Sequence, residues 1–289
     1  ATGLDFTFNS ISIGKGANSV SGNTVLGENA LDAAVTGANN TAIGKDSLTD
    51  NTSGASNVAI GVNCLQDNTT GSNNVAIGHG SLRLGETASN NTAVGRAVLN
   101  NCTGGNNTGL GYQVLNANTS GANNTGIGYN ALVVNTTGTG GVAVGYRALD
   151  SNTTGSYNVG IGQDALSGNS TGTQNMGIGV NAGMTITTGN YNTAIGPNSL
   201  RGTEVTGSHN VALGLQALNV ITSGSENVSI GNYSSHKLTT ATNNTAVGYA
   251  ALNDTTTGYN NVAIGRDALL ENTTGANNTA IGKGALDAN

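Results

Sequence analysis

The stretch NVAIGVNCLQDNTTGSN, residues 57–73, contains most of what decides the fold of this 289-residue chain. Its first five residues recur along the chain as a pentad that ends in glycine, and there are 17 copies of it. From Gly27 onward these glycines are 17 residues apart, except for one step of 16 and one of 18. An internal period of this kind indicates a repeat architecture, in which each copy is one unit that packs on its neighbours.

Residue types alternate within each pentad. An aliphatic residue precedes the glycine, as at Ile60, a β-branched residue stands two positions earlier, as at Val58, and a small residue usually lies between them, as at Ala59. This alternation is typical of a β-strand, whose successive side chains point to opposite faces. We interpret the Ile and Val face as the interior of a narrow coil. The Ala and Gly face is then a smooth outer strip that another backbone can approach closely.

The rest of the repeat carries a recurring Leu, a turn and a recurring Asn. We expect the Leu, such as Leu65, to fill the coil interior from the opposite wall. The NTTG segment that follows favours a turn, because Asn and Gly tolerate positive φ. The Asn that opens the pentad stands in 15 of the 17 copies, and stacked identical Asn side chains can form a hydrogen-bonded ladder. The residues that we assign to the structural ladder are Asn40, Asn57, Asn74, Asn91, Ile43, Ile60, Ile77, Gly44, Gly61 and Gly78.

These columns predict an all-β protein, a β-solenoid of about 17 coils with a 17-residue period. A helix is disfavoured because each period carries two glycines, and Gly in a helix interior costs about 1 kcal/mol relative to Ala. Residues 1–13 are expected to form an N-terminal cap or docking strand and the first coil. The segment Leu4 to Phe8 within them alternates apolar and polar residues. Residues 14–289 are expected to form the repeat solenoid, and we expect it to continue beyond the C-terminus in a parent protein.

Composition argues against several classes of function. Only 8% of the residues are charged and 3% are aromatic, and the net charge of −6 gives no reason to expect a nucleic-acid partner. No stretch approaches the 18 apolar residues of a membrane-spanning helix, so we expect no membrane insertion. The three histidines occupy different columns of the repeat, so no catalytic or metal-binding constellation is visible. We therefore expect no enzyme activity, no cofactor and no metal, and we read Cys64 and Cys102 as small buried thiols.

The pentads that begin at Asn40, Asn57 and Asn261 resemble the head repeats of trimeric autotransporter adhesins of the YadA type. The longer unit, ending in NTTG, resembles repeats of phage and bacterial fibre proteins that end in a self-cleaving endosialidase-type chaperone domain. The resemblance covers almost the whole chain. It implies a left-handed β-roll, a homotrimer, and a place on a surface-exposed, often adhesive fibre that is extracellular, on a cell surface or on a virion.

Together these features predict a structural and adhesive fibre segment of a surface appendage or a phage tail fibre. The Ala and Gly strip would pack copies of the chain around a common axis, and the rod ends could join into filaments. Besides itself, the chain would have a host-surface glycan or protein as partner. The surface proposed for a ligand consists of Tyr112, Tyr129, Tyr146, Tyr233, His236 and Lys237. The least regular coils, where repeat proteins often carry function, follow Gly78, Gly179, Gly196 and Gly231.

Two other functions compete with the fibre. An ice-binding solenoid, or another solenoid that binds a repetitive surface, would use the hydroxyl columns of the turn, such as Thr136, Thr153, Ser170 and Thr187. However, adjacent Thr residues in a strand face opposite ways. A polysaccharide-cleaving tail spike would need paired carboxylates on one face, and no such pair can be assigned.

Overall fold

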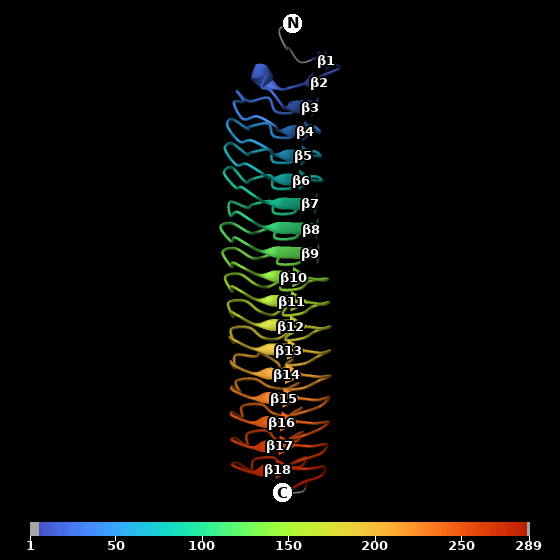
Figure 1. Cartoon of the computed structure of the whole chain (residues 1–289), viewed down its shortest axis with the longest axis vertical. Helices are drawn as coiled ribbons and strands as arrows, with labels where there is room; N and C mark the ends of the chain where they lie inside the picture. The colour runs from blue at the N-terminus through green and yellow to red at the C-terminus, as the bar shows by residue number, and fades with distance from the viewer. Residues whose placement is uncertain (1–5, 288–289) are drawn as a thin grey trace. The chain divides into compact units, whose positions relative to one another are not determined.

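The structure is a computed structural model that describes residues 6–287. The chain forms two compact units, residues 1–141 and residues 142–289, which we call the N-terminal unit and the C-terminal unit. Both are β-solenoids with one short strand in each coil, as Figure 1 shows. A 3₁₀ turn at Ala17–Ser19 is the one helical element among the described residues. The predicted all-β solenoid with a 17-residue period is therefore confirmed.

In the N-terminal unit the strands from β3 onward stack in parallel, and each pairs with the equivalent residues of the next coil. The register Val58↔Val75, for example, joins residues that are one 17-residue period apart. The strands are β1 (Phe6–Phe8), β2 (Ile11–Gly14), β3 (Thr24–Gly27), β4 (Thr41–Ile43), β5 (Val58–Ile60), β6 (Val75–Ile77), β7 (Thr92–Arg96), β8 (Thr108–Tyr112) and β9 (Thr125–Tyr129).

The C-terminal unit repeats this arrangement, and its ladder accommodates the single 18-residue step between Thr193 and Val211 without losing register. Its strands are β10 (Val142–Val144), β11 (Val159–Ile161), β12 (Met176–Ile178), β13 (Thr193–Ile195), β14 (Val211–Leu213), β15 (Val228–Ile230), β16 (Thr245–Val247), β17 (Val262–Ile264) and β18 (Thr279–Ile281). The extra residue is therefore absorbed outside the strand.

The first pentad copy is not part of the parallel stack. It forms β2, which pairs antiparallel with β3 on one side and with β1 on the other. The solenoid accordingly makes about 15 turns, fewer than the 17 expected from counting every pentad. The described part of the N-terminal segment is thus a hairpin along the edge of β3, while Leu4 and Asp5 lie outside the described residues.

The two faces of the strand are the reverse of the sequence-based assignment. The small middle residues point inward, and Ala42, Ala59 and Ala76 are completely buried. The aliphatic residues before the glycine point outward, so that Ile77 remains 36% exposed and Leu110 47%. The prediction that Ile and Val line the interior, with Ala and Gly on an outer strip, is therefore wrong. The ladder residues Ile43, Ile60 and Ile77 lie on the outer face.

The inversion follows from how little room the coil encloses. The recurring Leu does enter the interior, as predicted, and Leu48, Leu65 and Leu82 are completely buried. With a Leu entering from the opposite wall, the strand side holds only a methyl group or a hydrogen in most coils, and Val25 and Ser229 are the larger exceptions. The limit is visible at Gly126, where an added Cβ would collide with the side chain of Val114, a position occupied by Ala, Ser or Cys in most other coils. Close packing of this kind tolerates no extra methyl group.

A column of buried Asn side chains links successive coils. The Nδ2 of Asn74 donates to Oδ1 of Asn57 at 3.1 Å and to the carbonyl oxygen of Ala88 at 2.8 Å. Oδ1 of Asn74 in turn accepts from the backbone N–H of Asn91 at 3.0 Å. Asn74 therefore satisfies polar groups of both neighbouring coils, which would cost about 1–3 kcal/mol each if left buried and unpaired.

The pentad glycines are required by the stacking of the corners. Gly44 has a φ of 125°, and a Cβ added there would lie 2.5 Å from the carbonyl oxygen of Gly61 in the next coil. A side chain is therefore excluded both by the backbone conformation and by the neighbouring coil. The backbone at the recurring Leu also adopts the left-handed conformation, since Leu48 has a φ of 51°. Its complete burial offsets a conformation that costs a non-glycine residue about 1–2 kcal/mol.

Candidate functional site

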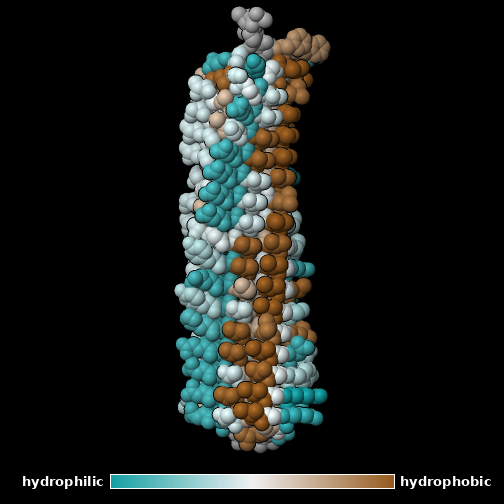
Figure 2. Space-filling view, in the orientation of Figure 1, coloured by the Kyte–Doolittle hydropathy of each residue, from teal (hydrophilic) through white to brown (hydrophobic). Residues whose placement is uncertain are grey.

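The outward-facing residues that precede the pentad glycines form a continuous apolar column on each unit, which we call the aliphatic stripe. Figure 2 shows it in brown beside paler and more polar columns. Its members are Leu26, Ile43, Ile60, Ile77, Val94, Leu110 and Ile127 in the N-terminal unit, and Val144, Ile161, Ile178, Ile195, Leu213, Ile230, Val247, Ile264 and Ile281 in the C-terminal unit. The next outward column contains Thr, Val and one Met, so neither column carries a charge.

The aliphatic stripe has a fixed repeat along its length. In-register parallel pairing places Ile161 beside Ile178, and Ile178 beside Ile195, at the spacing of adjacent strands, about 4.8 Å. Soluble monomers rarely expose contiguous apolar patches larger than a few hundred Å², and larger patches mark interaction surfaces. The stripe is therefore a candidate interface, and it replaces the Ala and Gly strip in that role.

Two of the tyrosines proposed for a ligand surface stack on each other in the N-terminal unit. The rings of Tyr112 and Tyr129 lie 5.2 Å apart and 8° from parallel, and the guanidinium of Arg96 lies 5.9 Å from the ring centre of Tyr112. Tyr146 belongs to the C-terminal unit and is half-exposed. The column after the pentad glycine thus presents stacked rings with a cation beside them, an arrangement that stabilises the stack through cation–π attraction.

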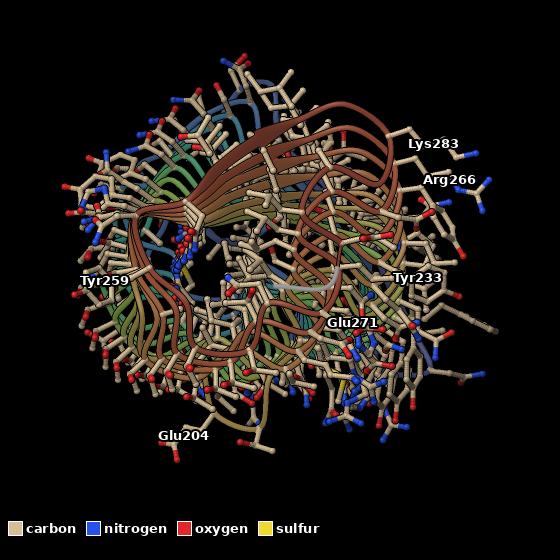
Figure 3. The ribbon with its side chains drawn as sticks, turned by 90° about the horizontal axis from the view of Figure 1, so that it is seen from below. Glu204, Tyr233, Tyr259, Arg266, Glu271 and Lys283 are labelled. Atoms are coloured by element: carbon tan, nitrogen blue, oxygen red, sulfur yellow. The ribbon has the colours of Figure 1, made fainter. Side chains whose placement is uncertain are left out.

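A second aromatic cluster in the C-terminal unit contains two more of the proposed residues. The ring of Tyr233 lies 5.9 Å from the ring of His236 and 5.9 Å from the ring of Tyr249, which it meets edge-on. The guanidinium of Arg266 lies 5.4 Å from the centre of Tyr249. Tyr233 and Arg266 project from the same side in Figure 3. Lys237 points its charge elsewhere, because its Nζ pairs with Asp254 at 3.0 Å.

The electrostatics of this cluster favour a neutral histidine. Burial lowers the pKa of His236, the positive charge of Lys237 lowers it further, and Asp254 acts in the opposite direction. The lowered pKa favours the uncharged form of the imidazole, which suits its packing against the ring of Tyr233. Arg266 was not among the residues proposed from sequence. It could have been found because it follows Tyr249 by one period in the same column.

A third ring pair was missed altogether. Tyr191 and His209 stack at 4.8 Å and 8° in the column that precedes the ladder Asn. Because one step of 18 residues separates the two positions, a search at the fixed period of 17 does not align them. Aromatic residues thus gather on several sides of the C-terminal unit instead of forming one binding site.

The hydroxyl columns of the turn are largely occupied by bonds along the solenoid. Oγ1 of Thr153 donates to the carbonyl oxygen of Ser170 at 3.0 Å, and Oγ of Ser170 donates to that of Thr187 at 3.1 Å. Their hydroxyl hydrogens are therefore used to join coils. A surface that binds ice or another repetitive lattice through this column would have to compete with those bonds.

The remaining chemistry of the described residues is sparse. In residues 6–287 no group of three or more His, Cys, Asp and Glu side chains gathers in a way that could hold a metal ion. Cys64 and Cys102 are buried and free, as predicted, and burial raises the pKa of the Cys64 thiol to about 11. Within the same described range, no helix has the length and apolar character that a membrane span requires.

Comparison with known proteins leaves the chain without an assigned family. A scan against protein-family models finds no matching family, and searches of curated proteins and of solved structures find no significant match. The resemblance to fibre repeats therefore rests on the pentads and on the 17-residue unit, and the structure adds the solenoid architecture.

Proposed function

We propose that the chain is a structural and adhesive segment of an extracellular fibre, in a bacterial surface appendage or a phage tail fibre. In this proposal, copies of the chain pack side by side through the aliphatic stripe. The observation that carries the proposal is the stripe itself, an uncharged column of Ile, Val and Leu that recurs in every coil of the parallel stack. An apolar surface with a fixed repeat is complementary to a second copy in the same register, which is the usual basis of symmetric assembly.

The energetics favour assembly over an isolated chain. Several stripe residues leave more than a third of their surface in water, as at Ile161 and Leu213, and the others are partly exposed. Burying apolar surface contributes roughly 25 cal/mol per Å², and the contribution accumulates over every coil of the stripe. The resemblance to trimeric adhesin heads suggests three copies around a common axis. A bundle of solenoids joined in this way would be a stiff spacer whose remaining sides are free to present a surface to a host glycan or protein.

The experiment that tests the proposal is the solution mass of the chain by light scattering on a size-exclusion column. We expect a mass three times the chain mass of 28.4 kDa. The triple variant Ile161→Thr, Leu213→Thr and Ile230→Thr should shift the mass toward that of the monomer, because Thr retains the strand preference and removes apolar contact.

The matched control replaces three residues of similar exposure that lie outside the stripe. Leu84, Val134 and Val180 are 39%, 39% and 46% exposed, and their replacement by Thr should leave the mass unchanged. A wild-type chain that runs as a well-folded monomer would contradict the proposal. The thermal hysteresis of that monomer would then test the ice-binding alternative.

A further inference from the structure

The C-terminal unit has a hollowed side whose lining residues differ from those of the aliphatic stripe and of the aromatic clusters. A hollow of about 370 Å³ is lined by Thr185, Arg201, Gly202, Thr203, Asn219 and Val220. A second hollow of about 290 Å³ shares Thr185 and Thr203 with the first and extends to Arg147 and Ser151. Because they share two lining residues, we treat them as one feature, the polar groove, which consists of Arg147, Ser151, Thr185, Arg201, Thr203 and Asn219.

The polar groove exists because one column of the repeat is small over four consecutive coils. Six residues after the pentad glycine stand Ser151, Gly168, Thr185 and Gly202, whereas most other coils place a larger residue there, such as Asp67, Leu84, Val134, Asp254 or Glu271. The smallest members cannot be enlarged without moving the backbone. A Cβ on Gly168 would lie 2.6 Å from the carbonyl oxygen of Met184, and one on Gly202 would collide with the carbonyl group of Ile221.

The groove also coincides with the least regular coils. The coil after Gly179 has Gly183 in place of the recurring Leu, and the coil after Gly196 is the one of 18 residues. In Figure 3, Glu204 from this longer coil projects on a different side of the unit from Tyr233 and Arg266. Deviations that keep the strand and alter only one side of the solenoid are where repeat proteins commonly place a binding surface.

Two polar atoms in the wall of the groove lack partners. Oδ1 of Asn219 and Oγ1 of Thr185 are buried and accept no hydrogen bond within residues 6–287. The other end of the Asn219 amide is engaged, since its Nδ2 lies 3.4 Å from Nε2 of His236. A buried polar atom without a partner costs about 1–3 kcal/mol, so a ligand that donates hydroxyl groups here would recover that free energy.

The groove also contains a positive charge that no carboxylate neutralises. One guanidinium nitrogen of Arg201 donates to Oδ1 of Asn198 at 3.2 Å, and no ion pair to Arg201 occurs within the described chain. Arg147, at the other end, is different because Asp150 and Asp164 both lie within ion-pair distance of it. Arg201 is therefore the group that is available to an anion, and guanidinium groups bind carboxylate and sulfate with paired hydrogen bonds.

We propose that the polar groove binds an acidic saccharide, a sugar chain with a carboxylate or sulfate group. Arg201 would contact the anion, while Asn219 and Thr185 would accept hydrogen bonds from sugar hydroxyls. The saccharide class is favoured because the lining offers hydroxyl, amide and guanidinium groups in a shallow hollow, and only Val220 and Met184 are large apolar residues in it. The inference rests on the proposed function, since an adhesive fibre requires a surface ligand.

The test measures binding of the full chain to immobilised oligosaccharides that carry a carboxylate, a sulfate or neither group. We expect binding to the acidic members and a loss of at least roughly tenfold in Arg201→Ala, because a hydrogen-bonded charge pair is removed. The matched control is Arg83→Ala, which removes an exposed arginine from the same repeat column in the N-terminal unit and should leave binding unchanged. Glu204→Gln should strengthen binding a few-fold, because it removes a negative charge next to Thr203, a residue that lines the groove.

Preference for carboxylated or for sulfated members identifies the anion, and either preference supports the proposal. Equal binding of neutral members, no binding at all, or an equal loss in Arg83→Ala would overturn it. The solution mass of Arg201→Ala keeps the two proposals apart, because the aliphatic stripe is unchanged in this variant. An oligomer that binds no acidic saccharide contradicts the groove alone, and a monomer that binds one contradicts only the assembly.

Discussion

The coil after Gly61 and the coil after Gly179 each fill their interior with a large aliphatic side chain, but the side chain comes from different positions of the repeat. In the first, Leu65 is buried in the interior and the turn begins with a buried Asn68. In the second, the Leu position is Gly183 and the turn position is Ile186, which is completely buried. A Cβ added to Gly183 would lie 2.9 Å from Cδ1 of Ile186, so the isoleucine occupies the space that the leucine fills elsewhere.

The same exchange occurs a second time in the C-terminal unit. The coil after Gly231 has Ser235 at the Leu position and Leu238 at the turn position, and both side chains are completely buried. The Oγ atoms of Ser235 and Ser229 are 2.7 Å apart and hydrogen-bonded, which satisfies the hydroxyl groups inside the coil. The comparison teaches that each coil needs a large aliphatic side chain in its interior, whereas the wall that supplies it can change. The strand and its glycine corner do not change.

The largest loss of stability is expected from a substitution at the glycine corner, which all coils share. Gly95→Ala places a Cβ in collision with the carbonyl group of Gly111 at a φ of 130°, so we expect a loss of about 3 kcal/mol or more in the free energy of unfolding. Urea denaturation followed by circular dichroism measures it. Gly80→Ala is the control, because its φ is 66°, no backbone atom lies nearby, and Ala97 holds the same place one coil later. A similar loss in both variants would contradict the distinction.

Because Ile186 fills the space that a Leu at position 183 would occupy, substitutions at these two residues should be strongly coupled. Gly183→Leu should overpack the interior against Ile186, and Ile186→Asn should leave a cavity, so each single variant should lose about 2–3 kcal/mol. The double variant restores the residue types of the regular coils, and it should lose less than the sum by roughly 1–2 kcal/mol. Denaturation of all four proteins measures the coupling. Additive losses would show that the two residues do not share one space.

The smallest expected effect concerns the thiol within the regular coil. The folded state raises the pKa of Cys64 from its ordinary value of 9.0 to about 11, chiefly through burial. The folded protein thus prefers the neutral thiol, and its stability is unaffected below pH 9. Between pH 9 and 11 the unfolded thiol ionises first, so stability should fall by roughly 2 kcal/mol.

Cys64→Ser isolates this effect, because Ser47 and Ser81 occupy the same column in the adjacent coils and are buried there. The variant should lose the part of the alkaline destabilisation that comes from Cys64 and change little at pH 7. Denaturation midpoints of the two proteins from pH 7 to 11 measure the difference. Parallel pH curves for the variant and the wild type would contradict the assignment to Cys64.

Most of the architecture could be predicted from the spacing of a few residue types. The 17-residue period, the strand at each pentad and the inward Leu column follow from alternation and from the turn residues. Alternation alone does not say which face is inside, because it defines two faces without their surroundings. Here the decisive quantity is the space left by the Leu column, and it admits Ala59 but not Ile60. The more hydrophobic face is consequently the outer one.

The sequence identified the coils after Gly179 and Gly196 as irregular, but it did not predict the residues of the polar groove. Its residues differ in type, and no single one deviates strongly from the consensus. The usable signal is the run of small residues in one column, Ser151, Gly168, Thr185 and Gly202, which becomes visible only when the coils are aligned by their glycines. Oδ1 of Asn219 has no partner, while Nδ2 of the same amide lies near His236 one coil away, and only the folded structure reveals these contacts.

The in-register stacking of equivalent residues in successive coils has an evolutionary consequence. Because every coil bonds only to its neighbours and presents them with the same strand, glycine corner and Asn, a gene segment that encodes one coil can be duplicated or deleted without creating a mismatched junction. Each such event would change a solenoid by one strand spacing, about 4.8 Å. Recombination can thus adjust the length of a fibre built from these coils in uniform steps. Point mutations outside the strand and the glycine corner can change the side chains that the coils present.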